Sequence, residues 1–172
     1  MFKLAGFLCI MIGCVGWGEA KIREEKSRVW HLRELMRIIR RIQDEIQYGK
    51  HTLPEICLIL AEYSDIWYGD YFRRIYEQLR QKNGTGLGKI WGQQMELCFL
   101  KVPLQEEEKD VLRRIPDCLG MQDETLQAMH IGQSMDMLTR KCRQAEETYE
   151  SKSKVIRSIS ILAGLFLTIF LI

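Results

Sequence analysis

The apolar positions along most of the chain recur with the period of an α-helix. Between Leu32 and Ile46, one face of a helix would carry the apolar residues Leu32, Leu35, Met36, Ile39, Ile42 and Ile46. No segment of residues 19–154 alternates apolar and polar side chains as a half-buried strand does. The pattern therefore predicts an all-α protein whose middle is a helical bundle.

Local start and stop signals divide this middle into about six helices. The first is expected from about Arg23 to Tyr48, ending at Gly49, because glycine is a common C-cap. The segment Thr52-Leu53-Pro54-Glu55 has the form of a capping box with proline in the first turn, so it opens a second helix. The later helices are expected over residues 65–82, 87–100, 104–120 (faltering near Pro116) and from about 123 onward.

The last of these helices carries an apolar seam with alternating spacings of four and three. Its members are Ile131, Met135, Leu138, Cys142, Ala145 and Tyr149. Such a seam suits a coiled coil with a partner as well as the core of a bundle. We interpret it as core packing and leave the coiled coil as the alternative.

Both ends of the chain are hydrophobic. Residues 4–18 carry no charge, and residues 155–172 carry only Arg157, which lies close enough to the start of the segment to reach an interface. We therefore expect an N-terminal transmembrane or signal-anchor helix over residues 1–20 and a C-terminal transmembrane helix over residues 155–172. The length of the first segment also fits a cleaved signal peptide, and that alternative stays open.

The charges divide in the same way. The chain has 25 Lys and Arg and 23 Asp and Glu, a net charge of +2, and only Lys3 and Arg157 lie outside the neutral segment 19–154. Lysine and arginine gather on the inner flank of each expected span, which predicts that residues 21–154 face the cytoplasm and that the lipid bilayer is a partner. In that reducing compartment we expect free thiols at Cys57, Cys98, Cys118 and Cys142.

Motifs that carry chemistry are missing from the sequence. The three histidines are widely separated and no Cys-x-x-Cys occurs, so we expect no metal site. Residues 84–89 (GTGLGK) resemble a phosphate-binding loop, but Ile90 stands where serine or threonine would bind magnesium. We therefore expect no catalytic residues, no cofactor and no small-molecule substrate, so the protein is not expected to be an enzyme.

A basic face on the first helix is the best candidate for docking a partner. It consists of Arg33, Arg37, Arg40 and Arg41. Because residues 19–154 are neutral as a whole, we do not expect nucleic acid to bind. The remaining interpretations are contact with anionic lipid headgroups, docking of an acidic protein, or simple solvation.

Several segments resemble a known family. They are residues 45–55 (EIQYGKHTLPE), 119–123 (LGMQD), 146–152 (EETYESK) and 154–158 (KVIRS). Together with the two hydrophobic ends, they resemble the stage III sporulation protein AB family of endospore-forming Firmicutes over nearly the whole chain. That family is similar to the cytoplasmic helical domain of the inner-membrane platform protein of type II secretion and type IV pilus systems. The matching turn positions are Gly49, Leu53 and Gly120, although the turn at residues 116–120 lacks the Gly-Glu pair of the secretion proteins.

The resemblance implies a location and a role. The protein would lie in the mother-cell membrane around the forespore, as a non-enzymatic platform or scaffold of the secretion-like channel required for endospore formation. It would couple a cytoplasmic secretion-type ATPase to membrane ring components, with other stage III sporulation channel subunits as partners. The alternative is a secreted or lipid-anchored helical binding module whose N-terminus is cleaved.

Overall fold

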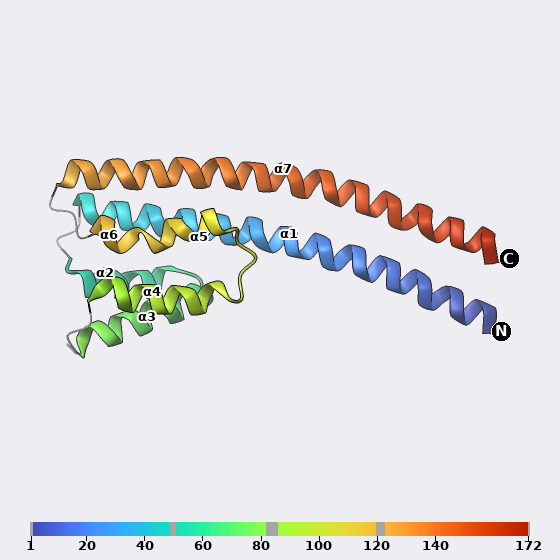
Figure 1. Cartoon of the computed structure of the whole chain (residues 1–172), viewed down its shortest axis with the longest axis horizontal. Helices are drawn as coiled ribbons and strands as arrows, with labels where there is room; N and C mark the ends of the chain where they lie inside the picture. The colour runs from blue at the N-terminus through green and yellow to red at the C-terminus, as the bar shows by residue number, and fades with distance from the viewer. Residues whose placement is uncertain (1, 49–50, 82–85, 120–122, 172) are drawn as a thin grey trace. The chain divides into compact units, whose positions relative to one another are not determined.

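A computed structural model describes residues 2–48, 51–81, 86–119 and 123–171. These residues form helices and connecting turns, and none of them lies in a strand, which confirms the predicted all-α class. Figure 1 shows the helices in chain order. Their bounds are α1 Phe2–Tyr48, α2 Leu53–Tyr63, α3 Ile66–Arg80, α4 Leu87–Phe99, α5 Glu106–Arg113, α6 Ile115–Leu119 and α7 Glu124–Leu171.

The chain divides into two compact units. Unit 1 contains residues 1–29 and 143–172, and unit 2 contains residues 30–142. Within unit 1, an ion pair between Lys152 and Glu25 joins α7 to α1. Within the described residues, no helix combines the length and the apolar character needed to cross a membrane. The predicted transmembrane helices of residues 1–20 and 155–172 therefore gain no support from the structure.

The predicted helix starts are confirmed where a side chain caps the first turn. At the start of α2, the backbone N–H of Thr52 donates to the Glu55 carboxylate at 2.7 Å, and the Thr52 hydroxyl donates to it at 2.9 Å. At the start of α3, the Asp65 carboxylate accepts from the backbone N–H of Trp67 at 3.1 Å. Both contacts satisfy N–H groups that have no partner inside the helix.

The predicted helix over residues 104–120 is instead two helices, α5 and α6. Pro116 explains the break, because proline has no N–H to donate to the carbonyl of Leu112 four residues earlier. That carbonyl accepts from the indole N–H of Trp91 in α4 at 2.8 Å instead. The proline therefore ends α5 and leaves the Leu112 carbonyl free to accept from Trp91, which joins α4 to α5.

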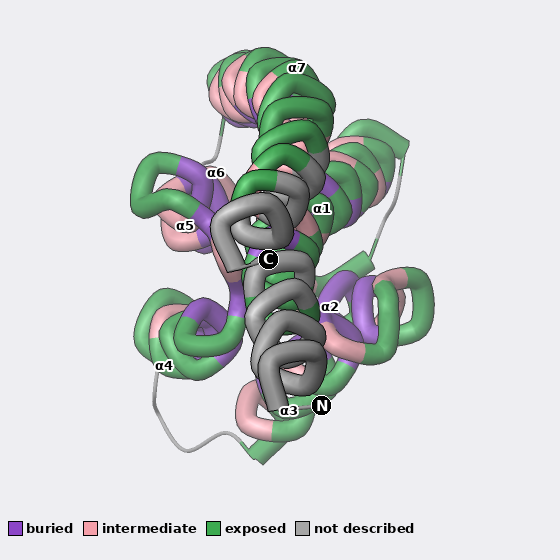
Figure 2. Tube along the Cα trace, turned by 90° about the vertical axis from the view of Figure 1, so that its right-hand side faces the viewer, coloured by how far each residue is buried: buried purple, intermediate pink, exposed green. Residues whose placement is uncertain are grey.

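The core of unit 2 is apolar and draws on most of its helices. Trp91 is fully buried, and its ring packs against Phe72 of α3 with ring centroids 5.6 Å apart. Ile131, Leu138 and Cys142 of α7 are also buried, so these positions of the apolar seam pack in the core as predicted. Figure 2 shows buried positions (purple) on the sides of α2, α4, α5 and α6 that face the interior of the bundle.

One glycine sets how closely α2 and α3 approach. Gly69 of α3 is buried, and a Cβ at this position would lie 2.7 Å from the backbone oxygen of Ala61 in α2. Real Cβ atoms do not approach a carbonyl oxygen so closely, so only glycine fits this helix crossing without a shift of the backbone.

Candidate docking surface

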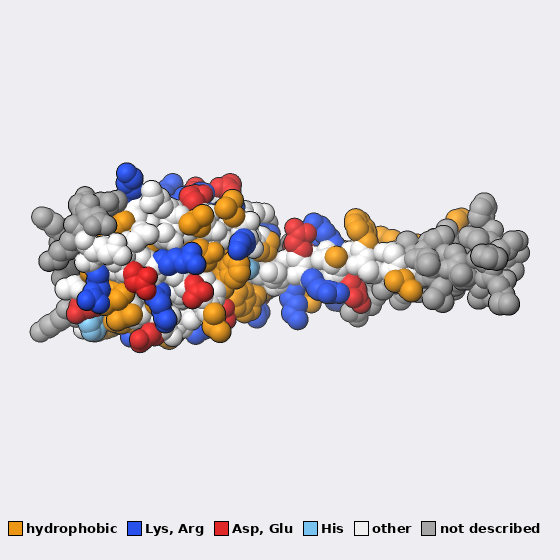
Figure 3. Space-filling view, turned by 90° about the horizontal axis from the view of Figure 1, so that it is seen from below, with side chains coloured by type: hydrophobic (Ala, Val, Ile, Leu, Met, Phe, Trp, Pro, Cys, Tyr) orange, Lys and Arg blue, Asp and Glu red, His pale blue; other side chains and the backbone are white. Residues whose placement is uncertain are grey.

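The four arginines of the predicted docking face lie on α1 within unit 2. Arg33, Arg37 and Arg40 are exposed, and Arg41 is half-buried. Figure 3 shows basic and acidic side chains interspersed over one face of unit 2, without a single large basic patch. The surroundings of each arginine therefore decide which of them is available to a partner.

Arg37 and Arg41 both lie close to the aromatic ring of Tyr63. Their guanidinium carbons are 5.1 Å and 5.6 Å from the ring centroid of Tyr63, the last residue of α2. A guanidinium over an aromatic face is attracted by the ring quadrupole. Hydrogen bonding with Tyr63, together with the charge of Glu34, raises the pKa of Arg37. These two arginines therefore help to hold α1 against α2.

Glu34 connects the same part of α1 to the start of α3. Its side chain is 4% exposed, and one carboxylate oxygen accepts from the backbone N–H of Asp65 at 2.8 Å. The other oxygen accepts from Arg37 at 2.9 Å. A buried carboxylate is tolerated when its oxygens are paired in this way. Arg37 therefore neutralises a buried charge and is part of the fold.

A second carboxylate organises the connection from α1 to α2. Glu45 is 6% exposed and pairs with Arg41 at 2.7 Å and with the Nδ1 atom of His51 at 2.6 Å. His51 precedes Leu53, the first residue of α2, and Leu53 is half-buried. The predicted motif turns at Gly49 and Gly120 lie outside the described residues, as does the loop over residues 82–85.

Arg40 is the arginine of this face that remains open to a partner. It is exposed, and no ion pair involves it in the part of the chain that the structure describes. Arg33 is exposed as well, but it has an interaction of its own within the chain. Sequence reasoning missed the acidic partners Glu34 and Glu45, although their spacing of three and four residues from Arg37 and Arg41 is the usual signal of helical ion pairs.

Charge reversal separates docking from folding on this face. Arg37→Glu places a like charge beside the buried Glu34, so we expect the free energy of unfolding to fall by roughly 1–3 kcal/mol. Arg40→Glu changes the same charge at an exposed site, so stability should change by less than about 0.5 kcal/mol. Thermal melts of the full-length chain check this contrast. If Arg40 contributes to docking, Arg40→Glu reduces co-precipitation of the partner at unchanged stability.

A buried polar pair lies deeper in unit 2. The Nδ1 atom of His31 in α1 is 2.9 Å from the hydroxyl of Tyr68 in α3, and His31 is 7% exposed. Burial lowers the pKa of His31, with an opposing contribution from Asp65. The folded state therefore favours the neutral imidazole, which shares a hydrogen bond with the hydroxyl of Tyr68.

This shift makes the stability of the bundle depend on pH. The ordinary pKa of His31 is 6.5, and its pKa in the folded chain is lower. Below pH 6.5 the unfolded chain therefore binds a proton at His31 more readily than the folded chain does. We therefore expect stability to rise as the pH increases from about 5 to about 7, with a slope from this one group of at most about 1.4 kcal/mol per pH unit. Denaturant melts at several pH values check this. The His31→Gln variant should lose this part of the slope, whereas His130→Gln should keep it.

Cys57 and Cys98, like Cys142, are buried in the core of unit 2. Cys57 and Cys98 are each at most 2% exposed, and burial raises the pKa of each thiol to about 12. Neither forms the reactive thiolate at neutral pH. Cys57, Cys98 and Cys118 are free thiols, as predicted. Within the described part of the chain, no group of three or more His, Cys, Asp or Glu residues is arranged to hold a metal ion.

The family model of stage III sporulation protein AB matches residues 3–172. The chain belongs to this family. Stage III sporulation protein AB of Bacillus subtilis (strain 168) is 27% identical over 173 residues, which cover 99% of each chain. A solved structure of a stage III sporulation protein AB is 22% identical, with a TM-score of 0.64, covering 72% of this chain and 97% of that chain.

These findings confirm the resemblance seen in the sequence. The stage III sporulation protein AB family extends over nearly all of the chain, so the bundle and both hydrophobic ends belong to one family pattern. The likeness to the solved structure extends to the helical fold. Membership of this family implies a role in sporulation, but it does not identify the docking residues.

Proposed function

We propose that the protein is a non-enzymatic, membrane-anchored scaffold subunit of the secretion-like channel between mother cell and forespore. It holds a cytoplasmic helical bundle at the mother-cell membrane and couples a secretion-type ATPase to the membrane ring components of the channel. The observation that carries this proposal is the match of the stage III sporulation protein AB family to residues 3–172.

The distribution of charge supports the membrane anchor. Residues 4–18 carry no charged side chain, and residues 155–172 carry one, at Arg157. Lysines and arginines accumulate beside each hydrophobic end on the side of the bundle, as the cytoplasmic flanks of membrane segments do. On this proposal, residues 1–20 and 155–172 are the anchors and residues 21–154 face the cytoplasm.

The coupling role is supported by the similarity of the family to the platform domain of type II secretion and type IV pilus systems. In those systems the domain belongs to a membrane protein that works beside a cytoplasmic ATPase. Leu53, at the start of α2, occupies the first shared turn position in this chain, together with Gly49. On this proposal the ATPase and other stage III subunits dock on exposed surfaces of the bundle, and Arg40 is one candidate contact.

Thiol labelling of an exposed position tests the orientation. Cys57 and Cys98 are buried and remain unlabelled while the bundle is folded, so a new cysteine is needed at an exposed site. Asp136 of α7 is exposed, and Asp136→Cys provides that site. The parent chain serves as the control for labelling of the native cysteines.

The two candidate topologies give opposite results in intact sporulating cells. The proposal predicts that a membrane-impermeant maleimide labels Asp136→Cys only after the cells are permeabilised. Labelling before permeabilisation would overturn the cytoplasmic assignment and favour the secreted or lipid-anchored module. An intact mass that retains residues 1–20 would argue against cleavage of the N-terminus.

A further inference from the structure

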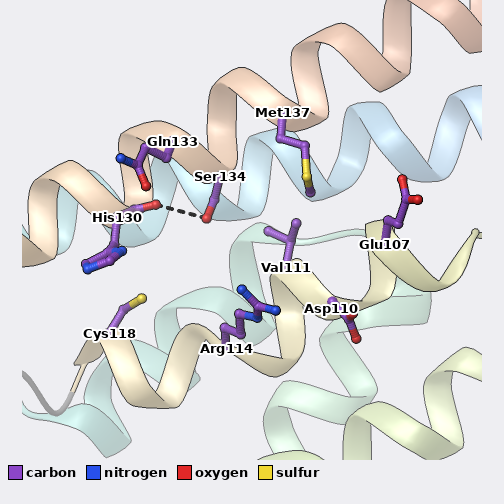
Figure 4. Close-up of a pocket in the computed structure, with 9 residues that line it drawn as sticks. All are labelled: Glu107, Asp110, Val111, Arg114, Cys118, His130, Gln133, Ser134 and Met137. Atoms are coloured by element: carbon purple, nitrogen blue, oxygen red, sulfur yellow. Dashed lines mark hydrogen bonds between the residues drawn. The ribbon is translucent and has the colours of Figure 1, made fainter.

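A cleft in unit 2 lies between α7 on one side and α5 and α6 on the other. It has a volume of about 320 Å³ and is open to solvent. Figure 4 shows the side chains around it. The lining residues are Glu107, Asp110, Val111, Arg114, Cys118, His130, Gln133, Ser134 and Met137.

The acidic residues of the cleft already have cationic partners. Glu107 pairs with Lys141 of α7, and Asp110 pairs with Arg113 at 2.7 Å. Arg114 forms no ion pair with any residue that the structure describes. The cleft is therefore left with an uncompensated guanidinium, which recognises carboxylates in a bidentate geometry.

Other polar side chains line the cleft as well. His130 and Gln133 of α7 are among them, and Figure 4 shows the His130 ring toward Cys118 rather than toward Arg114. The hydroxyl of Ser134 already donates to the backbone oxygen of His130 at 2.9 Å. Burial, with a smaller effect of Asp117, raises the pKa of Cys118, so the thiol is neutral at pH 7 and does not compensate Arg114.

The size and the apolar wall of the cleft narrow the choice of ligand. Val111 is 6% exposed and Met137 is half-buried, so part of the lining is apolar. A volume of about 320 Å³ is at the lower end of small-molecule sites and holds a few side chains rather than a whole helix. The chemistry that fits is a carboxylate beside an apolar side chain, as on one turn of an acidic amphipathic helix.

We propose that this cleft receives an acidic side chain from a protein partner, whose carboxylate binds Arg114. The adjoining apolar side chain of the partner packs against Val111 and Met137. This inference rests on the proposed scaffold function and names the chemistry of one of its docking sites: an Asp or Glu of a neighbouring channel subunit.

Site-specific crosslinking in sporulating cells tests the assignment. The probe is a photoreactive amino acid introduced at Gln133 of the full-length chain, and the crosslinked peptide is sequenced by mass spectrometry. The expected product is a segment of a channel subunit with an Asp or Glu beside an apolar residue. Arg114→Glu should lower the yield of this crosslink at least about tenfold, because it places a negative charge opposite the partner's carboxylate. Arg140→Glu, an exposed change of the same charge on α7, should leave the yield unchanged.

A charge swap completes the test. Lysine in place of the mapped acidic residue should restore crosslinking to the Arg114→Glu chain. Thermal melts check that the Arg114→Glu chain folds. If it does not fold, the loss of crosslinking is measured with Arg114→Gln instead. A crosslink to lipid, no crosslink, or one insensitive to Arg114 would overturn the proposal. If the channel subunits still co-purify with a chain that has lost the crosslink, the scaffold function stands. If they are never recovered with the wild-type chain, the scaffold function fails as well.

Discussion

Trp91→Ala lowers the free energy of unfolding of the bundle by about 4 kcal/mol or more. The side chain is fully buried, so its removal leaves a large cavity beside Phe72. The carbonyl of Leu112 also loses the indole N–H that replaces the bond Pro116 cannot make. An unpaired buried carbonyl adds to the cost of the cavity. We therefore expect α4 to loosen from α5 and α6 before the rest of the bundle unfolds.

Denaturant melts of the full-length chain followed by helical circular dichroism measure this effect. Trp17→Ala is the matched control, since Trp17 is 75% exposed and lies in unit 1. It should leave the transition of the bundle unchanged. A loss below about 1 kcal/mol for Trp91→Ala would mean that the tryptophan does not hold α4 in the core.

Gly69→Ala destabilises the bundle by roughly 1–3 kcal/mol, although alanine is the better helix former. The added Cβ would lie 2.7 Å from the backbone oxygen of Ala61, and a backbone atom cannot move aside as the end of a flexible side chain does. The helices α2 and α3 must therefore separate to admit one methyl group. The cost of that separation exceeds the gain in helix propensity.

Gly92→Ala is the matched control, with the opposite expected sign. Gly92 also lies inside a helix, α4, but nothing is within 4 Å of the Cβ position. The substitution should stabilise the chain by about 0.5–1 kcal/mol. Melting temperatures of the two variants check the pair. If Gly69→Ala melts above the wild type as well, the close approach of α2 and α3 does not exist in solution.

The sequence predicted most helix boundaries because the signals that set them are local. Thr52 with Glu55, and Asp65 with Trp67, form caps within three residues, and the structure contains both. The break between α5 and α6 was only half predicted. Pro116 marked the weak point, but whether a helix bends or divides there depends on the acceptor that the proline leaves. That acceptor is used by Trp91, which is 21 residues away along the chain.

The docking face was harder to interpret, because its meaning depends on tertiary contacts. The spacing of the four arginines placed them on one helix, and three of them are exposed. The contacts of Arg37 and Arg41 with the ring of Tyr63, and the hydrogen bond from Asp65 to Glu34, join residues more than 20 positions apart and have no sequence signature. The cleft at Arg114 was missed for the same reason, since it joins α5 and α6 to α7.

If one bundle links a cytoplasmic ATPase to membrane subunits of the sporulation channel, both kinds of partner should be recovered with it. The direct test is purification of the tagged full-length chain from membranes of sporulating cells, beside a chain that lacks residues 155–172. We expect the ATPase and the membrane subunits both to co-purify with the full-length chain. The shortened chain should keep the ATPase and lose the membrane subunits. Absence of the ATPase from both purifications, at equal amounts of the two chains, would contradict this link.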